Sequence, residues 1–251
     1  GDFKVSSNGF NRDCFFLFGR NAKADFEKIE VENIDTLQSK SFRDAGFFIM
    51  RHGKGYMFIN HSGKGRYSEI NSGTHTHSDL LSFEIFLDDK TFIVDPGTYL
   101  YSADPAERMK FRSTAMHNTV VVDKKNQNEI KKSELWGFER NAIPSLLQWT
   151  SDSQKDVFEG EHNGYTRLYK PVVHKRKIIF NKSESAWELI DMLVGEGEHY
   201  FEWFFHFDKE IELSVIDRKS VVTKSPGSNI RLDFFCDREY ELDIIKEPVS
   251  N

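Results

Sequence analysis

From Gly46 onward, the sequence is dominated by short runs in which apolar and polar residues alternate. A period of two places successive side chains on opposite faces of an extended strand, so one face of each run can be buried. Turn residues separate the runs, as in the glycine-containing tripeptide 52–54, which lies between apolar runs at 47–51 and 55–60. A short turn between two such runs is the signal for an antiparallel hairpin. This pattern predicts an all-β chain, folded as a large antiparallel β-sandwich.

Further strands are expected at short intervals along the rest of the chain. They cover residues 80–87, 91–94, 119–123, 156–161, 165–169, 172–180, 186–193, 199–207, 211–215, 230–236 and 240–245. Many short strands with hardly any helical periodicity are typical of a sandwich. The exceptions are residues 11–19, which indicate a short helix or turn closed by Gly19, and residues 104–111, which indicate one helical turn after Pro105.

The first 45 residues lack the alternation that follows them. We therefore divide the chain into a connecting segment, residues 1–45, and a sandwich, residues 46–251. A chain of 251 residues can bury a substantial core, and sandwiches of this length often form one domain. Because the sequence begins with polar residues and has neither an initiator Met nor a secretory signal, we expect a piece of a longer protein.

Charge and composition exclude several classes of partner. The formal net charge is −6, and no block of Lys or Arg suggests a nucleic-acid-binding arm. No apolar run is long enough to cross a membrane. Because the net charge is negative, an anionic substrate would need a locally positive site. The two cysteines, Cys14 and Cys236, are expected to be buried thiols, with a single disulfide as the alternative in an oxidising compartment.

Three separated motifs hold the candidate metal ligands. His75 and His77 stand at i and i+2, Asp95 follows a short apolar strand, and His117 precedes another. On an extended backbone the two imidazoles of His75 and His77 face the same way, about 6–7 Å apart. Imidazole nitrogen and carboxylate oxygen are ligands for a divalent cation such as Zn²⁺. The alternative is that each residue has an ordinary structural role, as a turn cap or a hydrogen-bonded core histidine.

A cationic segment lies just before the third motif. Arg108, Lys110 and Arg112 alternate, so an extended backbone would gather them into a positive strip, whereas a helix would scatter them. Both arrangements remain open from the sequence. Asn118, directly after His117, could orient a neighbour or donate a hydrogen bond to a ligand.

Taken in order, these motifs resemble the C-terminal β-sandwich of the heparinase II/III polysaccharide lyases. They are Gly-Thr-His-Thr-His-Ser-Asp from residue 73, Val-Asp-Pro-Gly-Thr-Tyr from residue 94, and Phe-Arg-Ser-Thr-Ala-Met-His-Asn-Thr from residue 111. Residues 159–165 and 173–176 are similar to that family as well. The ordered set is far more specific than any single motif in it.

The resemblance assigns roles to individual residues. It implies metal ligation by His77, Asp95 and His117, catalysis by His75 and Tyr101 (with Tyr99 as the alternative tyrosine), and substrate binding by Arg108, Arg112 and Asn118. The implied metal is one Zn²⁺, which fixes the loop that carries His75 rather than polarising the substrate.

The implied activity is β-elimination in a uronic-acid-containing polysaccharide, of the heparin or heparan sulfate kind or of the alginate kind. Members of the family place an α-helical toroid before the sandwich, so residues 1–45 would be its trailing end and the chain would be inactive without it. The implied parent protein is bacterial and periplasmic or secreted. The alternative function is a metal-containing, non-catalytic carbohydrate-binding module.

Overall fold

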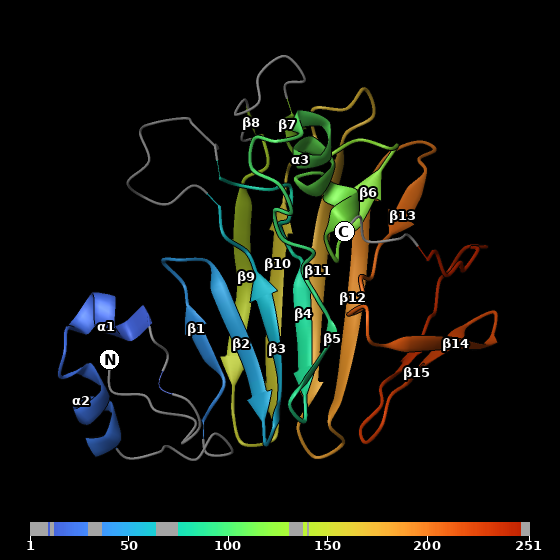
Figure 1. The fold of residues 1–251 in the computed structure, drawn as a ribbon. Coiled ribbons are helices and arrows are strands. Elements are labelled where there is room, and N and C mark those ends of the chain that lie inside the picture. Colours follow the sequence, from blue (N-terminus) through green and yellow to red (C-terminus); the bar gives the residue numbers. More distant parts are fainter. Residues whose placement is uncertain are drawn as a thin grey trace.

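The computed structural model describes residues 10, 13–29, 37–63, 75–130, 138–139 and 141–246. Most of the regular secondary structure in this part of the chain consists of antiparallel strands, with a few short helices (Figure 1). The predicted all-β sandwich class is thereby confirmed. Within the described residues, no helix has the length and apolar character that a membrane span requires.

The first sheet is a meander, in which each strand pairs with the next along the chain. Its strands are β1 (Lys40–Phe42), β2 (Phe47–His52), β3 (Gly55–Asn60), β4 (Phe83–Leu87) and β5 (Lys90–Ile93). The predicted hairpin is present, with Met50 opposite Met57 across β2 and β3. Strand β1 pairs with β2 although it lies before residue 46, so the sheet begins inside the segment expected to be only a connection.

The second sheet has the strand order β12-β11-β10-β9. Its strands are β9 (Pro144–Ser151), β10 (Lys155–His162), β11 (Val172–Asn181) and β12 (Ala186–Gly195). Strand β11 alternates buried and half-buried residues over its whole length, which is the period-two pattern of a strand with one face in a core.

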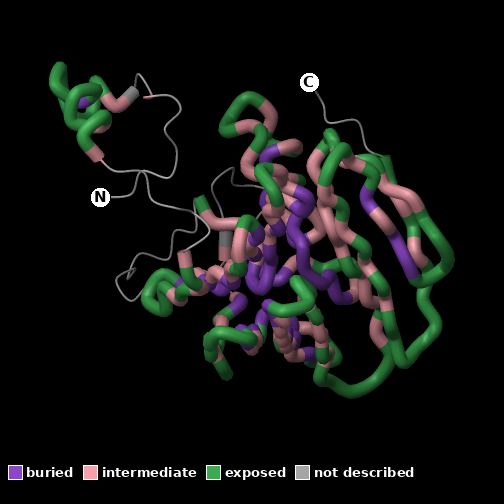
Figure 2. Tube along the Cα trace, turned by 90° about the horizontal axis from the view of Figure 1, so that it is seen from below, coloured by how far each residue is buried: buried purple, intermediate pink, exposed green. Residues whose placement is uncertain are grey.

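The core lies between these two sheets, and Figure 2 shows the buried residues gathered in the interior of the sandwich. It combines side chains from β2 to β5 with side chains from β10 and β11. Its members include Phe48, Met50, Met57, Ile59, Phe158, Ile178 and Phe180. Burial of one such side chain contributes about 1.5–3 kcal/mol, so this cluster is the main source of cohesion between the sheets.

Smaller elements complete the molecule. The strand pairs and triplets are β6 (Val120–Val122) with β13 (Phe201–Trp203), β7 (Glu129–Ile130) with β8 (Phe138–Glu139), and β14 (Glu212–Asp217), β15 (Ser220–Lys224) and β16 (Arg231–Asp233). The helices are α1 (Asp13–Phe18), α2 (Ala22–Lys28), α3 (Pro105–Phe111) and the 3₁₀ turn η2 (Thr114–Met116). Helices α1 and α3 lie where the sequence predicted helical structure.

Two predicted strands are wrong. Residues 165–169 form turns and a bend, in which the Leu168 N–H donates to the Tyr165 carbonyl oxygen at 3.2 Å. The Tyr165 hydroxyl is buried and donates to the Val120 carbonyl oxygen, 2.7 Å away. Residues 240–245 are mostly exposed and have no strand partner in the described part of the chain. Neither cysteine forms a disulfide, but Cys236 is exposed and Cys14 half-buried, so the expectation that both are buried is wrong.

Candidate functional site

The candidate site lies on loops at one end of the sandwich, near α3 and β6 (Figure 1). One loop, which contains His75 and His77, precedes β4. A second follows β5 and begins with Asp95, and a third connects α3 to β6 through His117. The start of β4 and the end of β5, in the first sheet, and the start of β6, which pairs with β13 in a separate sheet, border these three segments, although up to 42 positions separate them in the sequence, from 75 to 117.

His117 and Asp95 are directly hydrogen-bonded, with Nδ1 of His117 2.7 Å from Oδ2 of Asp95. The other Asp95 oxygen accepts a hydrogen bond from the Gly97 backbone N–H at 2.8 Å, where a φ of 72° suits glycine. The His77 ring lies beside the His117 ring, with centroids 5.2 Å apart. The structure thus brings all three predicted metal ligands together.

The charges of this cluster are strongly coupled. Burial disfavours protonation of His117, but the hydrogen bond to Asp95 and the charges of Asp79 and Asp95 outweigh it, so the pKa of His117 is raised. Burial alone would raise the pKa of Asp95, yet the same hydrogen bond lowers it. Burial and the neighbouring His117 lower the pKa of His77 to about 4. His77 is therefore neutral at pH 7, which is the protonation state that a metal ligand needs.

The geometry only partly fits a cation. His117 is fully buried, and its Nε2 atom has no hydrogen-bond partner among the described residues. In the neutral ring whose Nδ1–H donates to Asp95, this nitrogen carries a lone pair, which a cation could bind. However, Asp95 bonds His117 Nδ1 instead of facing a point shared by all three side chains. In the part of the chain that the structure describes, no three His, Cys, Asp or Glu side chains form a ligand cluster.

His75 and Tyr101 form a second pair beside the first. The Tyr101 hydroxyl lies 2.5 Å from Nδ1 of His75, and the two rings are 5.8 Å apart. The guanidinium of Arg108, on α3, stacks 4.7 Å from the centre of the Tyr101 ring. Tyr101 is 51% exposed, so its hydroxyl can meet a ligand from solution. The alternative tyrosine, Tyr99, instead stacks on Phe111 at 4.9 Å.

The cationic segment before His117 is helical, so the positive strip that an extended backbone would have formed is absent there. Arg108 and Arg112 are both buried. Nε of Arg112 donates to the Thr76 carbonyl oxygen at 3.1 Å, and the Arg112 carbonyl oxygen accepts from the Ser78 N–H at 3.0 Å. Arg112 therefore braces the loop between His75 and Ser78, and its predicted role in substrate binding stays a prediction.

Asn118 is also buried, and its amide bonds the backbone on both sides of the site. Its Nδ2 donates to the carbonyl oxygens of Phe83 and Val94, each at 2.8 Å, while its Oδ1 accepts from the His206 N–H at 2.6 Å. These contacts use both amide hydrogens. Of the two roles considered for Asn118, orienting its neighbours is the one that this geometry supports.

Two features of the site escaped the sequence interpretation. Asp79 lies close enough to His117 and Asp95 for its pKa to be affected by their charges, although burial is the main reason that its pKa is raised. Its position two residues after His77, within the same motif, was the available signal. The second feature is the buried ion pair of Arg176 and Asp191, which contacts the same loops; Arg176 lies in the stretch 173–176 that resembles the family, but no pattern pointed to this contact.

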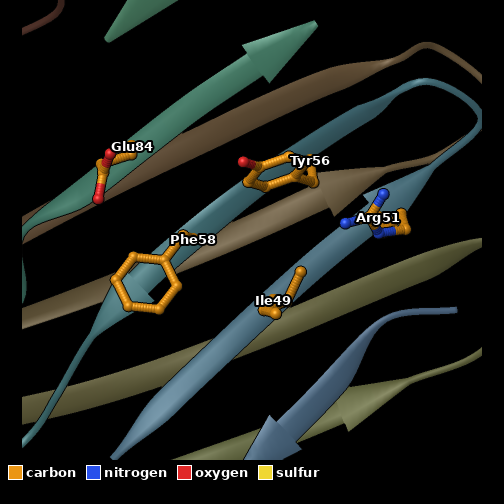
Figure 3. Close-up of a pocket in the computed structure, with 5 residues that line it drawn as sticks. All are labelled: Ile49, Arg51, Tyr56, Phe58 and Glu84. Carbon is orange, nitrogen blue, oxygen red and sulfur yellow. The ribbon is translucent and has the colours of Figure 1, made fainter. Parts of the chain in front are cut away.

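A separate hollow of about 330 Å³ lies on the outer face of the first sheet. Figure 3 shows the side chains that line it, which are Ile49, Arg51, Tyr56, Phe58 and Glu84. The Arg51 guanidinium packs 4.7 Å from the Tyr56 ring centre. None of the predicted site residues lines this hollow, so it does not bear on the chemistry of the loops.

The fold and the loops define the class: an antiparallel β-sandwich with paired acid–base side chains at one end. Residues 34–246 match the family model described as the C-terminal region of heparinase II/III-like proteins. The chain therefore belongs to this family, and the resemblance seen in its motifs is confirmed.

Named relatives agree with this membership. The chain is 26% identical over 206 residues to a heparin-sulfate lyase of Bacteroides stercoris, and 24% identical over 203 residues to a heparin-sulfate lyase of Pedobacter heparinus. These alignments cover 78% and 77% of the chain but only 27% of each relative. The chain thus spans about a quarter of the length of these lyases.

Solved structures share the fold. A heparan sulfate lyase of Pedobacter heparinus superposes with a TM-score of 0.66 and 21% identity, covering 89% of this chain and 33% of that one. A heparinase III structure superposes with a TM-score of 0.68 and 18% identity, covering 95% of this chain and 39% of that one.

Proposed function

We propose that this chain is the part of a polysaccharide lyase that contributes His75 and Tyr101 to β-elimination in a uronic-acid-containing polysaccharide. The observation that carries the proposal is the short contact between the Tyr101 hydroxyl and Nδ1 of His75, on loops held at one end of the sandwich. Relatives named as heparin-sulfate lyases support heparin or heparan sulfate as the first substrate to test, with alginate as the second.

The reaction needs three contributions. A base removes the proton next to the uronate carboxylate, an acid protonates the departing glycosidic oxygen, and positive or hydrogen-bonding groups stabilise the charge that develops. A phenol in contact with an imidazole can pass a proton from one to the other, which suits the first two steps. In this chain, Tyr101 would meet the reacting atoms because it is exposed, and His75 would accept or return the proton.

We also propose that His77, Asp95 and His117 hold one divalent cation, with Zn²⁺ as the first candidate. The buried Nε2 of His117, the adjacent His77 ring and the carboxylate of Asp95 are the donor types that zinc takes. When bound, the cation supplies positive charge that fixes its ligands and the loop on which they lie. His75, two residues from His77, would then be held beside the substrate.

The missing contributions would come from a further domain. Because the chain spans only about a quarter of its relatives' length, we propose that an N-terminal α-helical toroid completes the site and that this chain alone is inactive. We further propose that the parent protein is bacterial and periplasmic or secreted, since a polymeric polysaccharide is met outside the cytoplasm.

The test uses the full-length parent with heparan sulfate or alginate, and follows the ultraviolet absorbance of the unsaturated product. We expect Tyr101→Phe and His75→Ala each to lower the rate by roughly 10²–10⁴-fold, the usual contribution of a positioned acid or base. Tyr99→Phe is the matched control, because Tyr99 stacks on Phe111 instead of contacting His75. Its rate should stay near that of the wild type.

Two outcomes would redirect the assignment. Equal losses in Tyr99→Phe and Tyr101→Phe would remove the role given to the His75–Tyr101 pair. Polysaccharide binding by the full-length protein without any unsaturated product would favour the alternative, a non-catalytic carbohydrate-binding module.

A further inference from the structure

The most extensive buried polar network in the described part of the chain is centred on Arg176, a residue of β11. Its side chain and that of its cross-strand partner Asp191, on β12, are 1% and 4% exposed. Nε and Nη2 of Arg176 each lie 2.7 Å from an Asp191 oxygen, which is the fork-to-fork geometry of a bidentate pair. The pair lies inside the sandwich, so its hydrogen bonds have no competition from water.

The remaining guanidinium nitrogen of Arg176 reaches the candidate site. Its Nη1 donates to the Leu81 carbonyl oxygen at 2.6 Å and to the Asn118 carbonyl oxygen at 2.7 Å. Leu81 is four residues after His77, and Asn118 is next to His117. One nitrogen atom therefore joins the two chain segments that carry the neighbouring imidazoles.

The Leu81 segment needs such a contact. Leu81 has a φ of 64°, in the left-handed region that a leucine rarely adopts, so surrounding contacts must hold it there. Its N–H donates to the Asn60 carbonyl oxygen at 2.7 Å, and Arg176 bonds its carbonyl oxygen. A buried carbonyl without a donor is unfavourable, so loss of the guanidinium would favour rearrangement of this segment.

Asp191 is in turn fixed by other side chains. It accepts from Trp203 Nε1 at 3.0 Å, and one of its oxygens is 2.8 Å from Nε2 of His174. The series of hydrogen bonds continues from Nδ1 of His174 to Nε2 of His162, 3.3 Å away, and the Gly164 N–H donates to Nδ1 of His162. Because the Gly164 N–H can only donate, His162 and His174 must each carry the ring hydrogen on Nε2. The hydrogen bonds then all run in one direction, from Gly164 through the two histidines to Asp191. The orientation of Arg176 is thus set from the second sheet.

We propose that Arg176, oriented by Asp191, is a positioning residue that fixes the His77 segment against the His117 segment. It touches neither reacting atoms nor either imidazole. Lysine could not replace it, because an ammonium group lacks the planar fork that bonds a carboxylate and two carbonyl oxygens at once. Its importance for catalysis rests on the proposed function, but its effect on the geometry of the site does not.

The test is made on the 251-residue chain without metal or substrate, by amide hydrogen exchange and by the imidazole N–H spectrum. In Arg176→Lys, we expect the amides of Ser78 and Leu81 to exchange at least roughly tenfold faster, since local opening reports lost local contacts. The signal of the His117 Nδ1–H bonded to Asp95 should shift as well. The amides of the β2–β3 hairpin should keep their exchange rates.

Lys182→Arg is the matched control. Lys182 forms the other deeply buried ion pair of this sheet, with Nζ 2.8 Å from Oδ1 of Asp156, and bonds the Asp152 carbonyl oxygen instead of the site loops. This variant replaces lysine by arginine, the reverse of Arg176→Lys, in a pair that is similarly buried. We expect exchange at Ser78 and Leu81, and the His117 signal, to match the wild type.

Arg176→Lys with wild-type exchange at Ser78 and Leu81 would overturn the proposal, and so would an equal acceleration in Lys182→Arg. If Arg176→Lys does not fold, wild-type exchange in increasing denaturant decides instead. The amides of residues 78–82 should then open in the same cooperative step as those of β11, and an independent opening at lower denaturant would contradict the proposal. Neither measurement involves lyase activity, so a failure of the role proposed for Arg176 is distinct from a failure of the proposed function.

Discussion

His61 and His117 are both buried, yet their pKa values move in opposite directions. His117 has the Asp95 carboxylate 2.7 Å from its Nδ1, and this partner more than offsets the cost of burying a charge. His61 lies beside the packed rings of Phe48 and Phe158, and its Nε2 has no hydrogen-bond partner in the described part of the chain. Burial therefore dominates and lowers the pKa of His61 to about 4. For two buried imidazoles, the presence or absence of a carboxylate partner therefore decides the direction in which the pKa moves.

This difference predicts how stability depends on pH. The pKa of His61 is about 4 in the folded chain and near 6.5 in the unfolded chain, so the unfolded state binds the proton first as pH falls. The stability contribution is complete above the unfolded value and declines between these two values. Between about pH 6.5 and pH 5, one such histidine costs about 2 kcal/mol of unfolding free energy. In urea unfolding, the free energy of unfolding of His61→Phe should fall less than that of the wild type between about pH 6.5 and pH 5.

The control for this prediction is His52→Gln, because His52 is exposed at the end of β2. Its pH dependence should follow the wild type. If His61→Phe also follows the wild type, another group takes up the proton in the unfolded chain. His162 and His174 would then carry the acid sensitivity, because burial lowers the pKa of both.

At this scale, the sequence predicted proximity better than role. His77, Asp95 and His117 were expected together and lie together, on segments that border β4 and β5 of the first sheet and β6 of the two-stranded sheet. Their metal-binding role remains a prediction. For Arg112 and Asn118 substrate binding also remains a prediction, while each donates a hydrogen bond to a backbone carbonyl oxygen of a distant segment. Which carbonyl oxygen a buried side chain meets depends on the folded path of the chain, and no local pattern encodes it.

Among the secondary-structure elements, α3 has the clearest local determinants. Asp104 Oδ1 accepts hydrogen bonds from the N–H groups of Ala106 and Glu107, at 2.9 and 3.1 Å, and Pro105 occupies the first turn. Proline there loses no hydrogen bond, and the aspartate satisfies two otherwise unpaired donors. The helix matters for the site because Arg108 packs from it against the Tyr101 ring.

Removing this cap should destabilise the chain measurably. We expect Asp104→Ala to lower the free energy of unfolding in urea by about 1 kcal/mol, the usual cost of losing an N-cap side chain. Asp104→Ser, which keeps a capping oxygen, should retain most of the stability. Equal losses in the two variants would mean that the charge of Asp104, and not its hydrogen bonds, stabilises α3.

The elements that the sequence predicted well are those with clear turns on both sides, such as β2 and β3 around residues 52–55. Strands β9 and β15 were not predicted. No residue of β9 is fully buried, and a register shift opposite Glu159 and Gly160 interrupts the alternation of its half-buried residues. The predicted strand at 165–169 is wrong because Tyr165 and Leu168 lie in turns, although both side chains pack against β6 and its neighbours. Burial alone does not distinguish a strand from a packed turn.

At the scale of the whole molecule, the site joins segments that the core alone does not hold. The Asn118 N–H donates to Ser82 Oγ, and Arg176 of the second sheet donates to the carbonyl oxygens of Leu81 and Asn118, so the His75–Ser82 segment and the segment before β6 are bonded to each other and to that sheet. A ligand bound there would bind the folded chain and not the unfolded one, so it would stabilise the entire sandwich. Global stability can therefore report on occupancy of a local site.

This coupling gives a test of the proposed cation site on the chain alone. At a free Zn²⁺ concentration about a hundred times the dissociation constant, binding adds about 2.7 kcal/mol, which raises Tm by about 5–10 °C for a chain of this size. His77→Ala should abolish this increment, because it removes a proposed ligand whose ring is 5.2 Å from that of His117. His75→Ala should keep it, since His75 bonds Tyr101 instead. An unchanged Tm on zinc addition, or an equal loss of the Tm increment in both variants, would contradict the proposed cation site. The Asp95–His117 hydrogen bond would then organise these loops without a cation.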